Sequence, residues 1–174
     1  DVSYFANSLP NDPMLEDQWF HNNQGQSGGT LGKDIAMNQA WDVETGDQGI
    51  VVGVLDSGID WKHPDLIDNI WQNLAEDADG DGVVLVWNGS SWIFDPDDEN
   101  GIDDDGNGYV DDFIGWDFVN GDNNPMDDHE SGHGTHVAGL IAASGNNGIG
   151  ISGVAWNAQL MGLKILSETG AGYS

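Results

Sequence analysis

The chain has 174 residues, of which 31 are acidic and 3 are basic, and its formal net charge at pH 7 is -28. Such a surface repels phosphate groups, so we expect neither a nucleic acid nor an anionic membrane as a partner. Hydrophobic residues make up 38% of the sequence and include 8 Trp, which favours one packed domain over a disordered acidic chain. Cys is absent, so no disulfide can stabilise the fold.

The first helix is expected after about thirty polar, turn-rich residues. Between Asp34 and Val43, apolar side chains including Ile35, Ala40 and Trp41 recur at spacings of three and four residues. This spacing predicts a short amphipathic helix with these side chains on its buried face.

A buried strand is predicted next, over residues 50–55. Its sequence is continuously apolar and rich in β-branched residues, which is typical of a parallel strand covered on both faces. Asp56 follows at the carboxyl end of the strand, where ligand sites form in open α/β sheets. From these residues alone, Asp56 either orients a catalytic His or caps the turn that Ser57 and Gly58 begin.

Residues 67–113 form an acidic segment that we interpret as a surface insertion rather than a second domain. Within it, residues 83–87 and 92–94 predict a β-hairpin, with Asn88-Gly89 favouring a tight turn. Two loops carry oxygen-bearing side chains at alternate positions, the pattern that calcium binding requires. The calcium ligands predicted here are Asp77, Asp79 and Asp81 in the first loop, and Asp103, Asp105, Asn107, Tyr109 and Asp112 in the second. Neither loop ends in the Glu of a complete EF-hand, and the alternative is a solvated acidic loop.

The remaining segments predict a strand over residues 114–119, a helix over residues 132–143 and a strand over residues 159–166. Alternating strands and helices indicate a parallel α/β sheet. His133 opens the predicted helix, and His136 is expected to face inward as a packing residue. A single His in this position is either a catalytic base or a capping or core residue.

Several motifs occur in one fixed order along the chain. They are Val54-Leu55-Asp56-Ser57-Gly58-Ile59, His63-Pro64-Asp65-Leu66, Gly115-Trp116-Asp117-Phe118-Val119, the segment from His133 to Gly139, and Gly153-Val154-Ala155. In these motifs the chain resembles the subtilisin-like serine proteases, the subtilases, and is similar to their thermitase-type members. The resemblance implies a three-layer α/β fold with a largely parallel central sheet. It also implies that residues 1–174 are the N-terminal portion of a single catalytic domain.

The resemblance also implies roles for particular residues. Asp56 would be the triad acid and His133 the general base, while Gly170, Ala171 and Gly172 would pair with an extended substrate as an added β-strand. The family's nucleophile motif and oxyanion-hole Asn are both missing from this sequence, and Ser174 does not lie in such a motif. We therefore expect an N-terminal fragment of a secreted serine endopeptidase that acts on proteins or peptides. Its Ser would come from a missing or companion segment, and the chain alone would be inactive.

Two further calcium sites follow from the resemblance. The first would use Asp12, Asp65, Asn147, Ile149 and Ile151, the last two through their carbonyls, and the second would use Asp117, Asn120, Asp122 and Asn124. Calcium would be structural in all these sites and would suit an extracellular enzyme. The competing hypothesis is a non-catalytic calcium-binding module on a subtilase scaffold.

Overall fold

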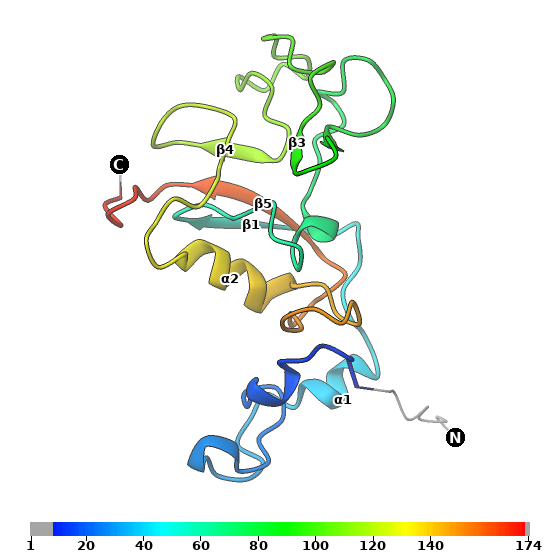
Figure 1. Cartoon of the computed structure of the whole chain (residues 1–174), viewed down its shortest axis with the longest axis vertical. Helices are drawn as coiled ribbons and strands as arrows, with labels where there is room; N and C mark the ends of the chain where they lie inside the picture. The colour runs from blue at the N-terminus through cyan, green and yellow to red at the C-terminus, as the bar shows by residue number, and fades with distance from the viewer. Residues whose placement is uncertain (1–8, 173–174) are drawn as a thin grey trace.

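The computed structural model describes residues 9–172, so expectations about residues 1–8 and Ser174 lie outside it. The elements follow one another along the chain in the order shown in Figure 1. The α-helices are α1 (Met37–Trp41) and α2 (His133–Ala142), and the strands are β1 (Val51–Asp56), β2 (Leu85–Trp87), β3 (Trp92–Phe94), β4 (Gly115–Asp117) and β5 (Gln159–Lys164). Three short 3-10 helices are η1 (Leu15–Asp17), η2 (Gln26–Gly28) and η3 (Ile67–Asn69).

The predicted parallel sheet is confirmed. Its strand order is β1-β5-β4, with β5 in the centre and both neighbours parallel to it. In the register of the sheet, Asp56 and Asp117 each lie opposite Lys164. All three strands therefore end at the same edge with a charged residue, and this edge carries the site described below.

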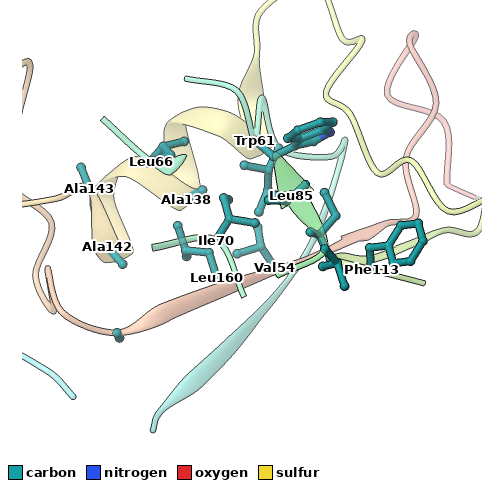
Figure 2. Packing of buried hydrophobic residues seen from close by; sticks show 14 residues of the cluster. Val54, Trp61, Leu66, Ile70, Leu85, Phe113, Ala138, Ala142, Ala143 and Leu160 are labelled. Atoms are coloured by element: carbon teal, nitrogen blue, oxygen red, sulfur yellow. The ribbon is translucent and has the colours of Figure 1, made fainter. Parts of the chain in front are cut away.

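Helix α2 packs on one face of the sheet. Its Ala138 and Ala142 are fully buried, and they lie against a cluster that includes Val54, Ile70 and Leu160 (Figure 2). Burial of each of the larger aliphatic side chains contributes about 1.5–3 kcal/mol. Because alanine side chains are small, they allow the backbone of α2 to lie close to the sheet at the end of β1.

The opposite face of β1 is not covered within residues 9–172. Val51 and Leu55 on that face are 40% and 60% exposed, whereas Val54 on the helix side is 3% exposed. The expectation of a strand buried on both faces is wrong for the described residues. Over this range the sheet and α2 form two layers rather than three.

Helix α1 is shorter than its sequence pattern suggested. Met37 and Trp41 are its buried residues, and the Trp41 ring lies 4.6 Å from that of Trp156. The expected contributions of Ile35 and Val43 are wrong, because both side chains are exposed. Ala40 is exposed as well, so one turn with an i, i+4 pair attaches this segment to the rest of the molecule.

The acidic insertion belongs to the main core rather than only to the surface. Its Val84, Leu85 and Phe113 are almost completely buried in the same cluster as Val54. The predicted hairpin is present as β2 and β3, but four residues, 88–91, connect the strands instead of a two-residue turn. Figure 1 shows the loops of the insertion in green, on the side of β4 that faces away from β5. Across residues 9–172, no helix combines the length and the apolar character that crossing a membrane requires.

Candidate active site

Asp56 is held at the carboxyl end of β1 by its own backbone and by the neighbouring strand. Its carbonyl oxygen accepts hydrogen bonds from the backbone N–H groups of Ile165 and Leu166 at 2.9 and 3.1 Å. Its carboxylate accepts the Ser57 backbone N–H at 2.7 Å, and its side chain is only 12% exposed. The carboxylate therefore has a fixed position before any partner side chain is considered.

His133 is the first residue of α2, and glycines bring it close to β1. Gly132 precedes the helix in the left-handed conformation, with φ of 61°, which favours glycine. A Cβ on Gly134 would overlap the carbonyl oxygen of Gly58 and approach the Cβ of Asp56 to 3.1 Å. The helix start can contact the end of β1 only because residue 134 has no side chain.

Asp56 and His133 meet at hydrogen-bond distance. The Oδ1 atom of Asp56 lies 2.7 Å from the Nδ1 atom of His133. An ionised carboxylate can only accept, so Nδ1 carries the proton and the neutral ring presents a lone pair on Nε2. The His133 side chain is 62% exposed, which leaves its outer edge accessible to a reacting group.

The two pKa values move apart. The hydrogen bond that His133 donates to Asp56, and then the negative charge of Asp56, raise the pKa of His133 above 6.5, with a smaller contribution from Asp127. Burial would raise the pKa of Asp56, but hydrogen bonds from His133 and Ser57 and the positive charge of His133 outweigh it and lower that pKa. The pair thus favours ionised Asp56 beside a His133 that readily accepts a proton, which is what general base catalysis needs.

A second carboxylate, that of Asp127, forms hydrogen bonds both to Ser57 after β1 and to Thr135 in α2. Its Oδ1 accepts the Ser57 hydroxyl at 2.9 Å, and its Oδ2 accepts the N–H and the hydroxyl of Thr135 at 2.9 and 2.6 Å. The Ser57 hydroxyl in turn accepts the Gly134 N–H at 3.0 Å. Sequence reasoning did not find Asp127, since nothing in Asp127-Asp128 marks one acid as a bridging residue.

The loop predicted to bind substrate is closed on itself. The Ala171 carbonyl accepts the Ser167 N–H at 3.0 Å, and the Ala171 N–H donates to the Ser167 hydroxyl at 3.2 Å. Gly170 has a φ of 76° and donates to the Ser167 carbonyl, and Gly172 pairs with Leu166. Both backbone groups of Ala171 are therefore engaged within this turn.

The structure brings together the residues of the first of the two calcium sites that the subtilase resemblance implied. Asp12 and Asp65, both buried, converge on the loop that carries Asn147, Ile149 and Ile151. Asp65 accepts the Asn147 amide at 2.8 Å and the Ile151 N–H at 3.0 Å.

The second family-type site already has a counter-ion. The Lys164 ammonium lies 3.4 Å from Asp117, whose carboxylate also accepts N–H groups from Val119 and Asn120. Asn124 accepts the Trp61 indole N–H, and Asp122 accepts the Asn124 N–H. Calcium binding by this second set stays a prediction.

The acidic loops are organised differently from their predicted ligand sets. Asp105 and Asp112 group with Glu76, with one oxygen from each within 4.8 Å of the others. Glu76 is fully buried, and sequence reasoning missed it because it lies outside the loop pattern. Asp103 instead caps the turn by accepting the N–H groups of Asn107 and Gly108, and the Tyr109 N–H donates to Asn107.

In the first acidic loop, the carboxylates of Asp77 and Asp79 group with that of Asp98. The predicted ligand Asp81 lies outside that group.

His136 is not a packing residue as expected. It is exposed and, with His63 and Leu140, lines an open cavity of about 470 Å³. Residue 136 lies about 200° around the helix from the buried Ala138, so it points away from the face of α2 that packs on the sheet.

Known proteins resemble this chain in sequence and in fold. The Peptidase_S8 model, described as the Subtilase family, matches residues 47–174. Subtilisin-like protease 1 of Plasmodium falciparum (isolate 3D7) is 46% identical over 115 residues, which cover 66% of this chain and 14% of that protein. A crystal structure of Aeromonas sobria serine protease with its chaperone superposes with a TM-score of 0.64 and 25% identity, covering 97% of this chain and 24% of that one. A protease structure from Pseudoalteromonas arctica PAMC 21717 superposes with a TM-score of 0.54 and 34% sequence identity. The match covers 95% of this chain and 41% of that one.

The fold and the matches define a subtilisin-like serine protease region. The chain belongs to the Subtilase family. It spans 14% of the length of the Plasmodium relative and 17% of PC3-like endoprotease variant B of Hydra vulgaris, so the activity of a whole protein is treated below as a proposal.

Proposed function

We propose that this chain is the N-terminal part of a secreted, calcium-stabilised serine endopeptidase, with Asp56 as the triad acid and His133 as the general base. The observation that carries this proposal is the 2.7 Å contact between Asp56 Oδ1 and His133 Nδ1, combined with the exposed outer edge of His133. Family membership supports peptide bonds as the substrate class.

The nucleophilic Ser is proposed to lie in the remainder of the protease, since the matched relatives are several times longer than this chain. His133 Nε2 takes the proton of that Ser hydroxyl while its oxygen attacks the substrate carbonyl. The imidazolium is stabilised by Asp56 and returns the proton to the leaving amine, which yields an acyl-enzyme. Water then repeats the steps and releases the acyl group. The proposal leaves this chain alone without peptidase activity.

Calcium is proposed to stabilise the loops. The Asp12–Asp65 site joins residues near the N-terminus of the described range to the loop after α2, and the Glu76–Asp105–Asp112 group lies inside the acidic insertion. A chain without Cys has no disulfide to fix these loops, and divalent cations can do so in an extracellular medium. The gathering of carboxylates from distant segments supports this role.

The endopeptidase proposal is tested on the longer protease that contains this chain and the Ser-bearing segment. A fluorophosphonate probe should label that Ser in the wild-type protein, because His133 activates the hydroxyl. Labelling should be lost in His133→Ala and retained in His136→Ala, which removes an exposed His of the same helix. A folded wild-type protein that never labels would instead support a non-catalytic calcium-binding module.

A further inference from the structure

The buried side chain of Asp98 has one oxygen that no group in the described structure satisfies. Asp98 lies in the turn after β3 and has 0% exposure. Its Oδ1 accepts the backbone N–H groups of Ala78 and Asp79 at 2.8 and 3.2 Å, so the carboxylate lies directly against the first acidic loop. Its Oδ2 has no hydrogen-bond partner.

Two other carboxylates lie close to that of Asp98. One oxygen from each of Asp77, Asp79 and Asp98 lies within 4.8 Å of the others. The ion pairs in residues 9–172 involve only His133 and Lys164, so none of them neutralises this group. Buried charge without a partner is strongly unfavourable. In agreement with this, burial first, and then the negative charges of Asp77 and Asp95, raise the pKa of Asp98.

Backbone hydrogen bonds within the loop hold Asp77 in place. Asp77 accepts the Gly80 and Gly82 N–H groups at 2.7 and 2.8 Å, which curls the loop around its own carboxylate. Both glycines have positive φ values, 79° and 94°. Asp79 is held by one oxygen through the Asp81 N–H and keeps its other oxygen available.

The hairpin explains how a residue nineteen positions beyond Asp79 reaches this loop. Strands β2 and β3 pair from Leu85–Phe94 to Trp87–Trp92, and the Asp95 N–H donates to the Val84 carbonyl at the base. Because of this pairing, the chain after β3 lies next to the segment before β2. Asp98 is thereby placed within hydrogen-bond distance of Ala78. The loop pattern lacks a closing acidic residue of its own, and Asp98 supplies one from the far side of the hairpin.

We propose that Asp77, Asp79 and Asp98 form a calcium site that locks the β2–β3 hairpin onto the acidic loop. This inference rests on the proposed calcium stabilisation of the protease and names an additional site and its closing ligand. All three ligands are hard oxygen donors without His or Cys, a set that suits calcium rather than zinc. The exposed side of the loop leaves room for water to complete the six to eight ligands that calcium takes.

The first measurement counts bound calcium per chain by equilibrium dialysis at about 1 mM free Ca²⁺, the range of extracellular sites. Asp98→Asn keeps the oxygen that accepts Ala78 and Asp79 but removes the charge. It should lose one bound ion relative to the wild type. Asp97→Asn removes the same charge from the neighbouring exposed carboxylate and should lose none.

The second measurement compares melting temperatures of the same variants in EDTA and in Ca²⁺. Without calcium, Asp98→Asn should melt at or above the wild-type temperature, because it relieves repulsion among three carboxylates. With calcium, it should melt about 3–8 °C below the wild type, because bound ligand stabilises only the folded state that can hold it. Asp97→Asn should follow the wild type in both conditions.

Other outcomes distinguish failure of the Asp98 site from failure of calcium binding by the protease as a whole. If Asp98→Asn melts lower than the wild type by the same amount in both media and binds as many ions, Asp98 is a structural loop anchor and the proposed site is wrong. If the wild-type chain binds no calcium at all, the broader calcium proposal fails together with this one.

Discussion

Replacing Asp56 by Asn is expected to lower turnover of the longer protease by about 10⁴-fold, with little loss of folded structure. An Asn amide in this position can donate to His133 Nδ1, which stabilises the tautomer that places the proton on Nε2. In that tautomer the ring has no lone pair with which to accept the Ser proton. The imidazolium that forms during acyl transfer also loses its carboxylate partner. Steady-state peptide hydrolysis, alongside circular dichroism of the same preparation, measures both parts of the expectation.

The matched control for this variant is Asp68→Asn. Asp68 is an exposed acid in η3, so the substitution changes the net charge equally without touching His133. Its turnover should equal that of the wild type. Turnover of Asp56→Asn within a few-fold of the wild type would contradict the assignment of Asp56 as the triad acid.

Replacing Gly134 by Ala is expected to produce the largest structural effect. The added Cβ would overlap the Gly58 carbonyl oxygen, which is backbone and cannot rotate away. The start of α2 must therefore move away from β1, and the contact between His133 and Asp56 must lengthen. We expect a destabilisation of about 3 kcal/mol, the upper part of the usual range for overpacking. Thermal unfolding should then shift downward by roughly 6–12 °C for a domain of this size.

Gly139→Ala provides the control in the same helix. A Cβ on Gly139 would meet only the end of the Ile151 side chain, at 3.4 Å, an ordinary contact. This variant should keep or slightly raise the melting temperature, because Ala favours helix over Gly by about 1 kcal/mol. Equal melting temperatures for the two variants would show that the close approach at Gly134 is unimportant.

Much of the site could be predicted because local sequence determines it. Asp56 ends an apolar run rich in β-branched residues, and His133 begins a helix after a glycine, so both positions follow from element boundaries. That the two side chains meet, although 77 positions separate them, was implied by the resemblance to the subtilases and not by the local sequence.

The parts that were missed depend on contacts between distant segments. Asp98 and Glu76 complete acidic groups only because the hairpin and the 103–112 loop fold back against residues 76–79. Lys164 neutralises Asp117 through its position on the central strand, which the sequence motif around Asp117 does not reveal. The exposure of Leu55 likewise reflects which face of the sheet is covered, and an apolar run alone cannot specify that face.

The pH dependence of the Asp56–His133 pair follows from the direction of each shift. The raised pKa of His133 means that its stabilising contribution is present below about 6.5 and is lost as pH rises through its folded-state value. The lowered pKa of Asp56 means that its contribution is present above about 3.9 and is lost as pH falls through its folded-state value. The pair therefore stabilises the fold most between about pH 3.9 and about pH 6.5, where both contributions are fully present.

The most direct test is a ¹⁵N NMR titration of the histidine rings of this chain, with His133 assigned through the signal that disappears in His133→Gln. In the wild type we expect His133 to carry its proton on Nδ1 when neutral and to titrate above 6.5. In Asp56→Asn, its pKa should fall and the neutral tautomer should change. A His133 signal that titrates at the ordinary value, and does so equally in both proteins, would contradict the pairing on which the proposed catalytic role depends.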